Sequence, residues 1–243
     1  MSLNKDLQIV LRPHCVDYVG FADLTNHEEE LARFGGDIVI GYRVGISLAL
    51  VIPDSIVDHL PERKNANVSA EYRIHGYDVL NARLDLIASV VSSYLNQKGY
   101  RTLPIAVAET TDIENNAPTV SHKMIAHISG MGWIGKNCLL ITPEHGPRLR
   151  LISVLTNAPL ETVNNPLEQR CGECEECVRV CPVKAIKGKK YVLGESREQR
   201  LDARKCRGYF DSMEKSSRYA VCGMCLYACP IGKVKSSPRG AQP

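Results

Sequence analysis

The sequence has no run of eighteen or more apolar residues and no basic, apolar leader at its start, so it predicts neither a membrane span nor export. We expect a cytoplasmic protein. At 243 residues, the chain is long enough to bury a sizeable core without disulfide bonds. Its ten cysteines are bunched toward the C-terminal end. In a reducing compartment, such clustering indicates metal ligands more than bridges.

The net charge of +3 hides an uneven distribution. Residues 1–160 carry 14 Lys and Arg against 17 Asp and Glu, whereas residues 161–243 carry 16 against 10. A basic half is typical of nucleic-acid binding. A second interpretation competes with it, because iron-bound thiolates add negative charge that nearby lysines and arginines would offset.

Four cysteines stand within the segment CGECEECVRVCP, residues 171–182. The spacing C-x2-C-x2-C-x3-C-P is the run of bacterial-type ferredoxins, in which three thiolates bind one 4Fe-4S cluster and the fourth binds another. It therefore predicts further cysteines, which VCGMCLYACP and LDARKC supply. By this logic, one cluster is held by Cys171, Cys174, Cys177 and Cys229. The other is held by Cys181, Cys206, Cys222 and Cys225, with an inserted segment setting Cys206 apart from the simple repeat.

Structural zinc and a redox dithiol are the alternatives to clusters. Zinc would favour two tetrads without the x3-C-P ending, so the spacing favours iron–sulfur clusters. The two remaining cysteines, Cys15 and Cys138, stand beside apolar residues. We interpret both as small buried side chains with a structural role.

Upstream, apolar residues at helical spacing predict a helix over residues 77–99, closed by Gly99, and a shorter helix over residues 120–130. Extended runs are expected at residues 41–53, 102–109, 138–142 and 148–156. The pattern predicts a layered α/β (α+β) domain over residues 1–160. A linker rich in Pro and Asn follows, and leads into a ferredoxin-like domain with two 4Fe-4S clusters over residues 161–243.

The segment GMGWIGKNCLLIT, residues 130–142, has three glycines in six residues between a helix and a strand. Such glycines allow the backbone to approach a large flat group, with Trp133 and Lys136 at its border. The order of helix and strand is the reverse of the dinucleotide-binding fingerprint. A tight turn around a buried tryptophan is the alternative.

The segment SGMGWIGKNCLLITPEHGPRLRLISVLTNAPL, with the double cysteine motif and LDARKC, resembles the core of the epoxyqueuosine reductase family, which in turn resembles the reductive dehalogenases. The likeness covers roughly residues 70–232. It implies a nitroreductase-like α/β domain that binds base-off cobalamin, and two clusters that pass electrons to cobalt. It also implies that the corrin lies beside the family's turn, matched here by Gly130, Gly132, Trp133, Gly135, Lys136 and Asn137.

Three differences from that family bear on activity. The sequence ends about a dozen residues after Pro230, where full-length members carry helical repeats that help to hold tRNA, and it has no twin-arginine leader of the dehalogenase kind. Asn115 or Asn116 stands where the family has an aspartic acid, and an amide cannot donate a titratable proton. We expect weak direct tRNA binding and little turnover of epoxyqueuosine, with Asp112 and His122 as the proton donors that would replace the acid.

The sequence thus predicts an iron–sulfur oxidoreductase, cobalamin-dependent by the resemblance, that reduces a small molecule or a modified nucleoside. Two alternatives stay open: a ferredoxin-type electron carrier that serves another enzyme, and a tRNA epoxyqueuosine reductase whose RNA is bound by a separate partner. The expected electron donor is a ferredoxin or flavodoxin. The basic run KGKK, residues 187–190, is either a solvated turn or the docking face for that donor.

Overall fold

A computed structural model describes residues 2–108, 118–217 and 219–233 of the chain. Within these ranges, a sheet of four strands has the order β1-β2-β6-β3, and every pair of neighbours is antiparallel. The strands are β1 (Tyr18–Asp23), β2 (Val44–Val51), β3 (Thr102–Ile105) and β6 (Leu149–Thr156). The fold is therefore of the mixed α+β form. The strands expected upstream are confirmed, and β1 is an additional strand that the sequence pattern missed.

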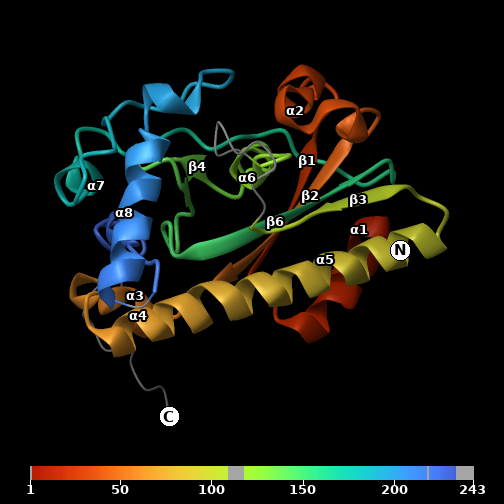
Figure 1. The fold of residues 1–243 in the computed structure, drawn as a ribbon. Helices are drawn as coiled ribbons and strands as arrows, with labels where there is room; N and C mark the ends of the chain where they lie inside the picture. The colour runs from red at the N-terminus through yellow and green to blue at the C-terminus, as the bar shows by residue number, and fades with distance from the viewer. Residues whose placement is uncertain (1, 109–117, 218, 234–243) are drawn as a thin grey trace, which may run out of the picture.

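Helices cover both faces of this sheet (Figure 1). The long helix α5 and helix α1 pack on one face, and α6 packs on the other. The N-terminal helices are α1 (Leu3–Leu11), α2 (Glu28–Gly35), α3 (Asp54–Asp58), α4 (Ala66–Arg73) and α5 (Val79–Gln97). They are followed by α6 (His122–Ile128), α7 (Glu176–Arg179), α8 (Ala203–Ser217) and α9 (Met224–Tyr227). None of the helices in the described ranges is long and apolar enough to cross a bilayer.

The helix expected over residues 77–99 is α5, which continues from α4 through one π-helical turn, Ile74–Asp78. Leu84, Ile87, Val91 and Leu95 recur at helical spacing, and all are buried against the sheet. Gly99 ends the helix in the left-handed conformation, at φ +87°. The sequence pattern therefore located this helix to within two residues at each end.

The cysteine-rich half shares its core with the sheet domain. Met213, Val221 and Leu226 belong to the same buried cluster as Leu60 and Tyr72. At Gly223, where φ is +67°, an added Cβ would lie only 2.6 Å from Leu60 Cδ1. This close packing holds the C-terminal cysteine motif in place through contacts with the N-terminal half. The domain boundary near residue 160 stays a prediction.

Candidate metal centre

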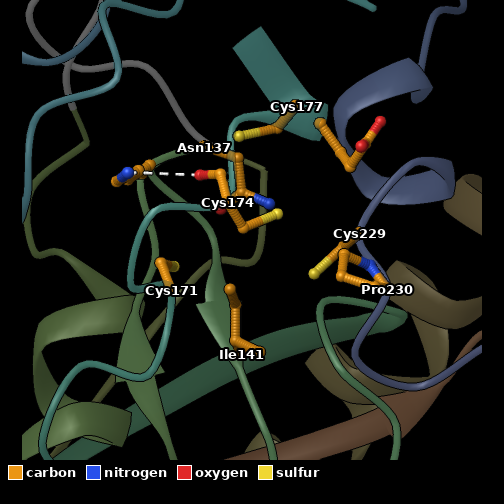
Figure 2. A pocket seen from close by; sticks show the side chains of 9 residues that line it. Asn137, Ile141, Cys171, Cys174, Cys177, Cys229 and Pro230 are labelled. Atoms are coloured by element: carbon orange, nitrogen blue, oxygen red, sulfur yellow. Dashed lines mark hydrogen bonds between the residues drawn. The ribbon is translucent and has the colours of Figure 1, made fainter. Parts of the chain in front are cut away.

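A first cysteine group, Cys171, Cys174, Cys177 and Cys229, surrounds a small hollow that is partly open to solvent (Figure 2). Cys171 and Cys174 lie on the segment that leads into α7, where the Cys174 N–H donates to the Cys171 carbonyl at 2.9 Å, and Cys177 lies on α7 itself. The fourth follows α9 and is 7% exposed. The structure therefore brings together the four residues that ferredoxin spacing assigns to one cluster.

The second cysteine group, Cys181, Cys206, Cys222 and Cys225, is recognised from the electrostatic coupling of its thiols. Burial raises the pKa of Cys206 to about 11, and the thiols of Cys222 and Cys181 act in the same direction. Burial also raises the pKa of Cys225 far above its usual range, and its neighbouring thiols include Cys177 of the first group. The two groups therefore adjoin each other, and Cys206 of α8 reaches the second one across the inserted segment.

The first group is also coupled. Burial raises the pKa of Cys177 to about 11, and the thiols of Cys171, Cys229 and Cys174 add to the rise. Because thiolates are the form that binds metal, loading these groups would release protons. Within the described residues, no three His, Cys, Asp or Glu side chains converge closely enough to hold a single metal ion.

The glycine-rich turn at residues 130–137 packs against these cysteines. Trp133 of β4 (Trp133–Ile134) is 1% exposed and shares a small core with Ile141, Cys171 and Cys229. Lys136 Nζ donates to the Cys174 carbonyl at 3.2 Å, and the next residue, Asn137, donates from Nδ2 to the Cys225 carbonyl at 3.3 Å. The turn therefore touches both cysteine groups.

The glycines of the turn serve contacts within the protein. A Cβ at Gly132 would lie 2.3 Å from the carbonyl oxygen of Ile141, on β5 (Leu140–Ile141), and one at Gly135 would lie 2.4 Å from Ile141 Cδ1. These positions admit no side chain because β4 and β5 lie so close together. Gly130 has φ +78° and lies close to the Asn165 carbonyl. The turn is thus a tight structure around a buried tryptophan, and its contact with a corrin stays a prediction.

The proposed proton donors fall on different parts of the chain. Asp112, and with it Asn115 and Asn116, lies outside the described residues. His122 opens α6 with both ring nitrogens in contact with protein groups: Nδ1 lies 3.1 Å from Ser153 Oγ, and Nε2 lies 3.1 Å from the Ala106 carbonyl oxygen. These contacts orient the ring between β6 and the segment after β3.

The two cysteines outside the groups differ from each other. Cys138 is 2% exposed and lies 3.5 Å from Nη1 of Arg200, so the prediction of a buried side chain is confirmed for it. Cys15 is exposed, and the prediction was wrong there. It occupies a left-handed position, at φ 48°, in the turn between η1 (Arg12–His14) and β1, where its side chain points away from the core.

Two arginines with long-range contacts carried no signal in the sequence. Arg148, at 1% exposure, joins the sheet to α3 through bonds of 2.7 Å to Asp54 and to Asp58. Burial raises the pKa of Cys222, and the guanidinium of Arg63 opposes that rise by its charge and by a hydrogen bond. Both arginines act across long stretches of sequence, so no local motif marks them.

The cysteine-rich half meets the sheet domain at one especially close backbone contact, and this predicts a sensitive position. An added Cβ at Gly146, where φ is +57°, would lie 1.9 Å from the Ile231 carbonyl oxygen, just after Cys229. Gly36 has the same φ and open space around it. Both substitutions place a Cβ at a positive φ, at a backbone cost of about 1 kcal/mol or more, and overpacking adds about 1–3 kcal/mol to Gly146→Ala alone.

At about 2–4 °C per kcal/mol, Gly146→Ala should melt several degrees below Gly36→Ala in thermal unfolding followed by circular dichroism. Equal melting temperatures for the two variants would mean that the contact at Ile231 is not as close as described.

Comparison with known families agrees with this geometry. The profile of the 4Fe-4S double cluster binding domain matches residues 170–232, which include all eight cysteines of the two groups. The fold and the site together define an iron–sulfur protein in which a double-cluster module packs against an α+β domain.

The epoxyqueuosine reductase of Bacillus anthracis is 30% identical over 96% of this chain and 65% of its own length. The chain is a homologue of the epoxyqueuosine reductases, as the sequence resemblance predicted. It spans about half to two thirds of the length of the curated relatives it matches.

Two solved structures share the fold. An epoxyqueuosine reductase crystallised with an epoxyqueuosine-modified tRNA-Tyr stem loop aligns with a TM-score of 0.60 at 21% identity, over 96% of this chain and 66% of that one. A catabolic reductive dehalogenase aligns with a TM-score of 0.70 at 21% identity, over 93% of this chain and 31% of that one. The mixed α+β arrangement is therefore common to both groups of proteins.

Proposed function

We propose that this chain is a cytoplasmic iron–sulfur reductase of the epoxyqueuosine reductase type, acting on a modified nucleoside in tRNA. The observation that carries the proposal is the packing of two cysteine groups, within a double-cluster domain, against an α+β domain of this family. The relative solved with a tRNA stem loop aligns over nearly the whole chain. That likeness favours direct RNA binding over the weak tRNA binding expected from the sequence.

The first and second cysteine groups are the proposed ligands of one 4Fe-4S cluster each. Four thiols around a common hollow match the donor set of such a cluster. The coupling between Cys177 and Cys225 shows that the groups adjoin, as one-electron transfer between two clusters requires. Reduction of an epoxide to an alkene consumes two electrons and two protons and releases water, so two one-electron centres suit that chemistry.

The corrin contacts expected of the six residues in the glycine-rich turn stay a prediction. Trp133, Lys136 and Asn137 are 1%, 7% and 4% exposed, and their contacts go to the cysteine groups. A branched residue at Gly132 would clash with Ile141 whether or not a corrin is bound. We propose that Trp133, Lys136 and Asn137 support the clusters. The three glycines, Gly130, Gly132 and Gly135, allow the close packing of the turn. We also propose that the sheet domain has the layered arrangement of the nitroreductases.

The electron donor we propose is a small acidic carrier such as a ferredoxin or flavodoxin. Exposed cations flank the second cysteine group: Lys184 follows Cys181, whose sulfur accepts from the Ala185 N–H at 3.2 Å, and Arg204 lies beside Cys206 on α8. The exposed Lys189 and Lys190 follow on the same segment. An acidic protein bound here would place its cofactor near the second cluster, with an association rate that falls as salt rises.

His122 is the described residue that we propose as a proton donor. Its ring is oriented by Ser153 and the Ala106 carbonyl, and it lies on α6 beside the sheet. His122→Asn should lower the single-turnover rate about 10²-fold or more, while the iron content and melting temperature stay near those of the wild type. Loss of stability without a change in rate would assign His122 a structural role instead.

A further inference from the structure

Lys136 places a buried ammonium group against the first cysteine group. Its side chain lines the same hollow as the four thiols and is 7% exposed. Its Nζ donates to the Cys174 carbonyl, the bond dashed in Figure 2. None of the ion pairs between described residues includes Lys136.

One carboxylate, that of Glu176, also lines the hollow. It pairs with Arg179, so its charge is already engaged. Burying an ammonium group without a counter-charge costs several kcal/mol. Thiolates bound to an iron–sulfur cluster would provide that counter-charge, and they are the anionic groups that the hollow gathers around Lys136.

The second cysteine group has a different cation. Arg63, which follows η3 (Leu60–Glu62), donates from Nη2 to the Tyr209 hydroxyl at 2.8 Å. Tyr209 lies on α8, the helix that carries Cys206. The residue next to Lys136 that touches this group is neutral: Asn137 donates to the Cys225 carbonyl. Among the described residues, Lys136 is thus a cation at the first cysteine group and Arg63 one near the second, and both come from outside the double-cluster domain.

A cation beside a 4Fe-4S cluster acts on its redox equilibrium. The cluster with four thiolates is anionic and gains one further negative charge on reduction, so a fixed positive charge stabilises the reduced form more than the oxidised form. Net charge and hydrogen bonding are among the factors that set the potentials of these centres. The effect is larger for a buried cation, because less solvent screens it.

We propose that Lys136 and Arg63 set the reduction potentials of the two clusters separately: Lys136 raises that of the first, and Arg63 raises that of the second. Lys136 is the more buried of the two, so its effect is the larger. A raised potential at the first cluster draws electrons toward it from the second. The proposal rests on the cluster assignment made above.

The test is a redox titration of anaerobically reconstituted full-length protein, followed by electron paramagnetic resonance. Lys136→Gln should lower the equilibrium constant for reduction of the first cluster about tenfold or more, and a tenfold change corresponds to 59 mV for a one-electron couple. The reduction potential of the second cluster should stay unchanged. Arg63→Gln should do the reverse. Lys136→Arg keeps the charge and should stay closer to the wild-type potential than Lys136→Gln does.

Iron content tests the cluster assignment separately from the effect of the two charges. Wild-type protein that does not hold two clusters would refute the cluster assignment itself. With both clusters present, unchanged potentials in Lys136→Gln, or equal shifts in Lys136→Gln and Lys136→Arg, would overturn the role of the charge. If Lys136→Gln fails to hold the first cluster, the Arg63→Gln variant decides. The proposal requires that Arg63→Gln lowers the reduction potential of the second cluster and leaves that of the first cluster unchanged.

Discussion

Cys206→Ala is expected to lower the iron content of the reconstituted protein from about eight atoms per chain to about four, because it removes one ligand of one 4Fe-4S cluster. Cys206 lies on α8, away from the compact motifs, but its half-buried thiol is coupled to those of Cys222 and Cys181. The remaining cluster should be the one held by the first cysteine group. Iron analysis and the paramagnetic resonance spectrum of the reduced protein would measure this.

Two further variants make the iron experiment specific. Cys177→Ala should also halve the iron, but should spare the second cluster, so the two half-loaded proteins should differ in their spectra. Cys138→Ala removes a more deeply buried thiol that belongs to neither group, and it should keep about eight iron atoms. Full iron in Cys206→Ala, or zinc in the wild-type protein, would refute the assignment of two clusters.

Expression of this chain in a strain lacking epoxyqueuosine reductase should restore queuosine in the tRNA. The reason is that the chain aligns over nearly its whole length with family members, including one solved with its tRNA stem loop. Restoration should fall to background, by at least about 10²-fold, in a variant that cannot load a cluster, such as Cys225→Ala. Queuosine content by mass spectrometry of digested tRNA is the measurement.

This experiment also separates the proposed reductase from the electron-carrier alternative. A carrier would hold both clusters and accept electrons from an acidic donor, but it would leave epoxyqueuosine in the tRNA unchanged. That outcome would also support the inference first drawn from Asn115 and Asn116, that an amide at the acid position prevents turnover. Arg204→Glu serves as a matched control for donor supply, because it should slow reduction of the clusters in a salt-dependent way without loss of iron.

The iron–sulfur chemistry could be predicted from the sequence alone because its determinants are local. Twelve residues contain four cysteines at the spacing that one turn and one short helix require, and Pro182 and Pro230 mark the ends of the two motifs. The helix α5 and the strands β2 and β6 were predictable for a similar reason, since their apolar periodicity is contained within each segment. The short, half-exposed strand β1 has no such pattern, and it was missed.

The tertiary structure alone decided what surrounds the cysteines. The strand order β1-β2-β6-β3 joins segments that are distant in sequence, and no local pattern encodes such pairing. The spacing of the glycine-rich turn did not reveal that Lys136 lies on Cys174 and Asn137 on Cys225. Arg63 reaches Cys222 only because both halves of the chain share one core. Sequence spacing thus determined which residues can bind the clusters, whereas long-range packing determined which charges lie beside them.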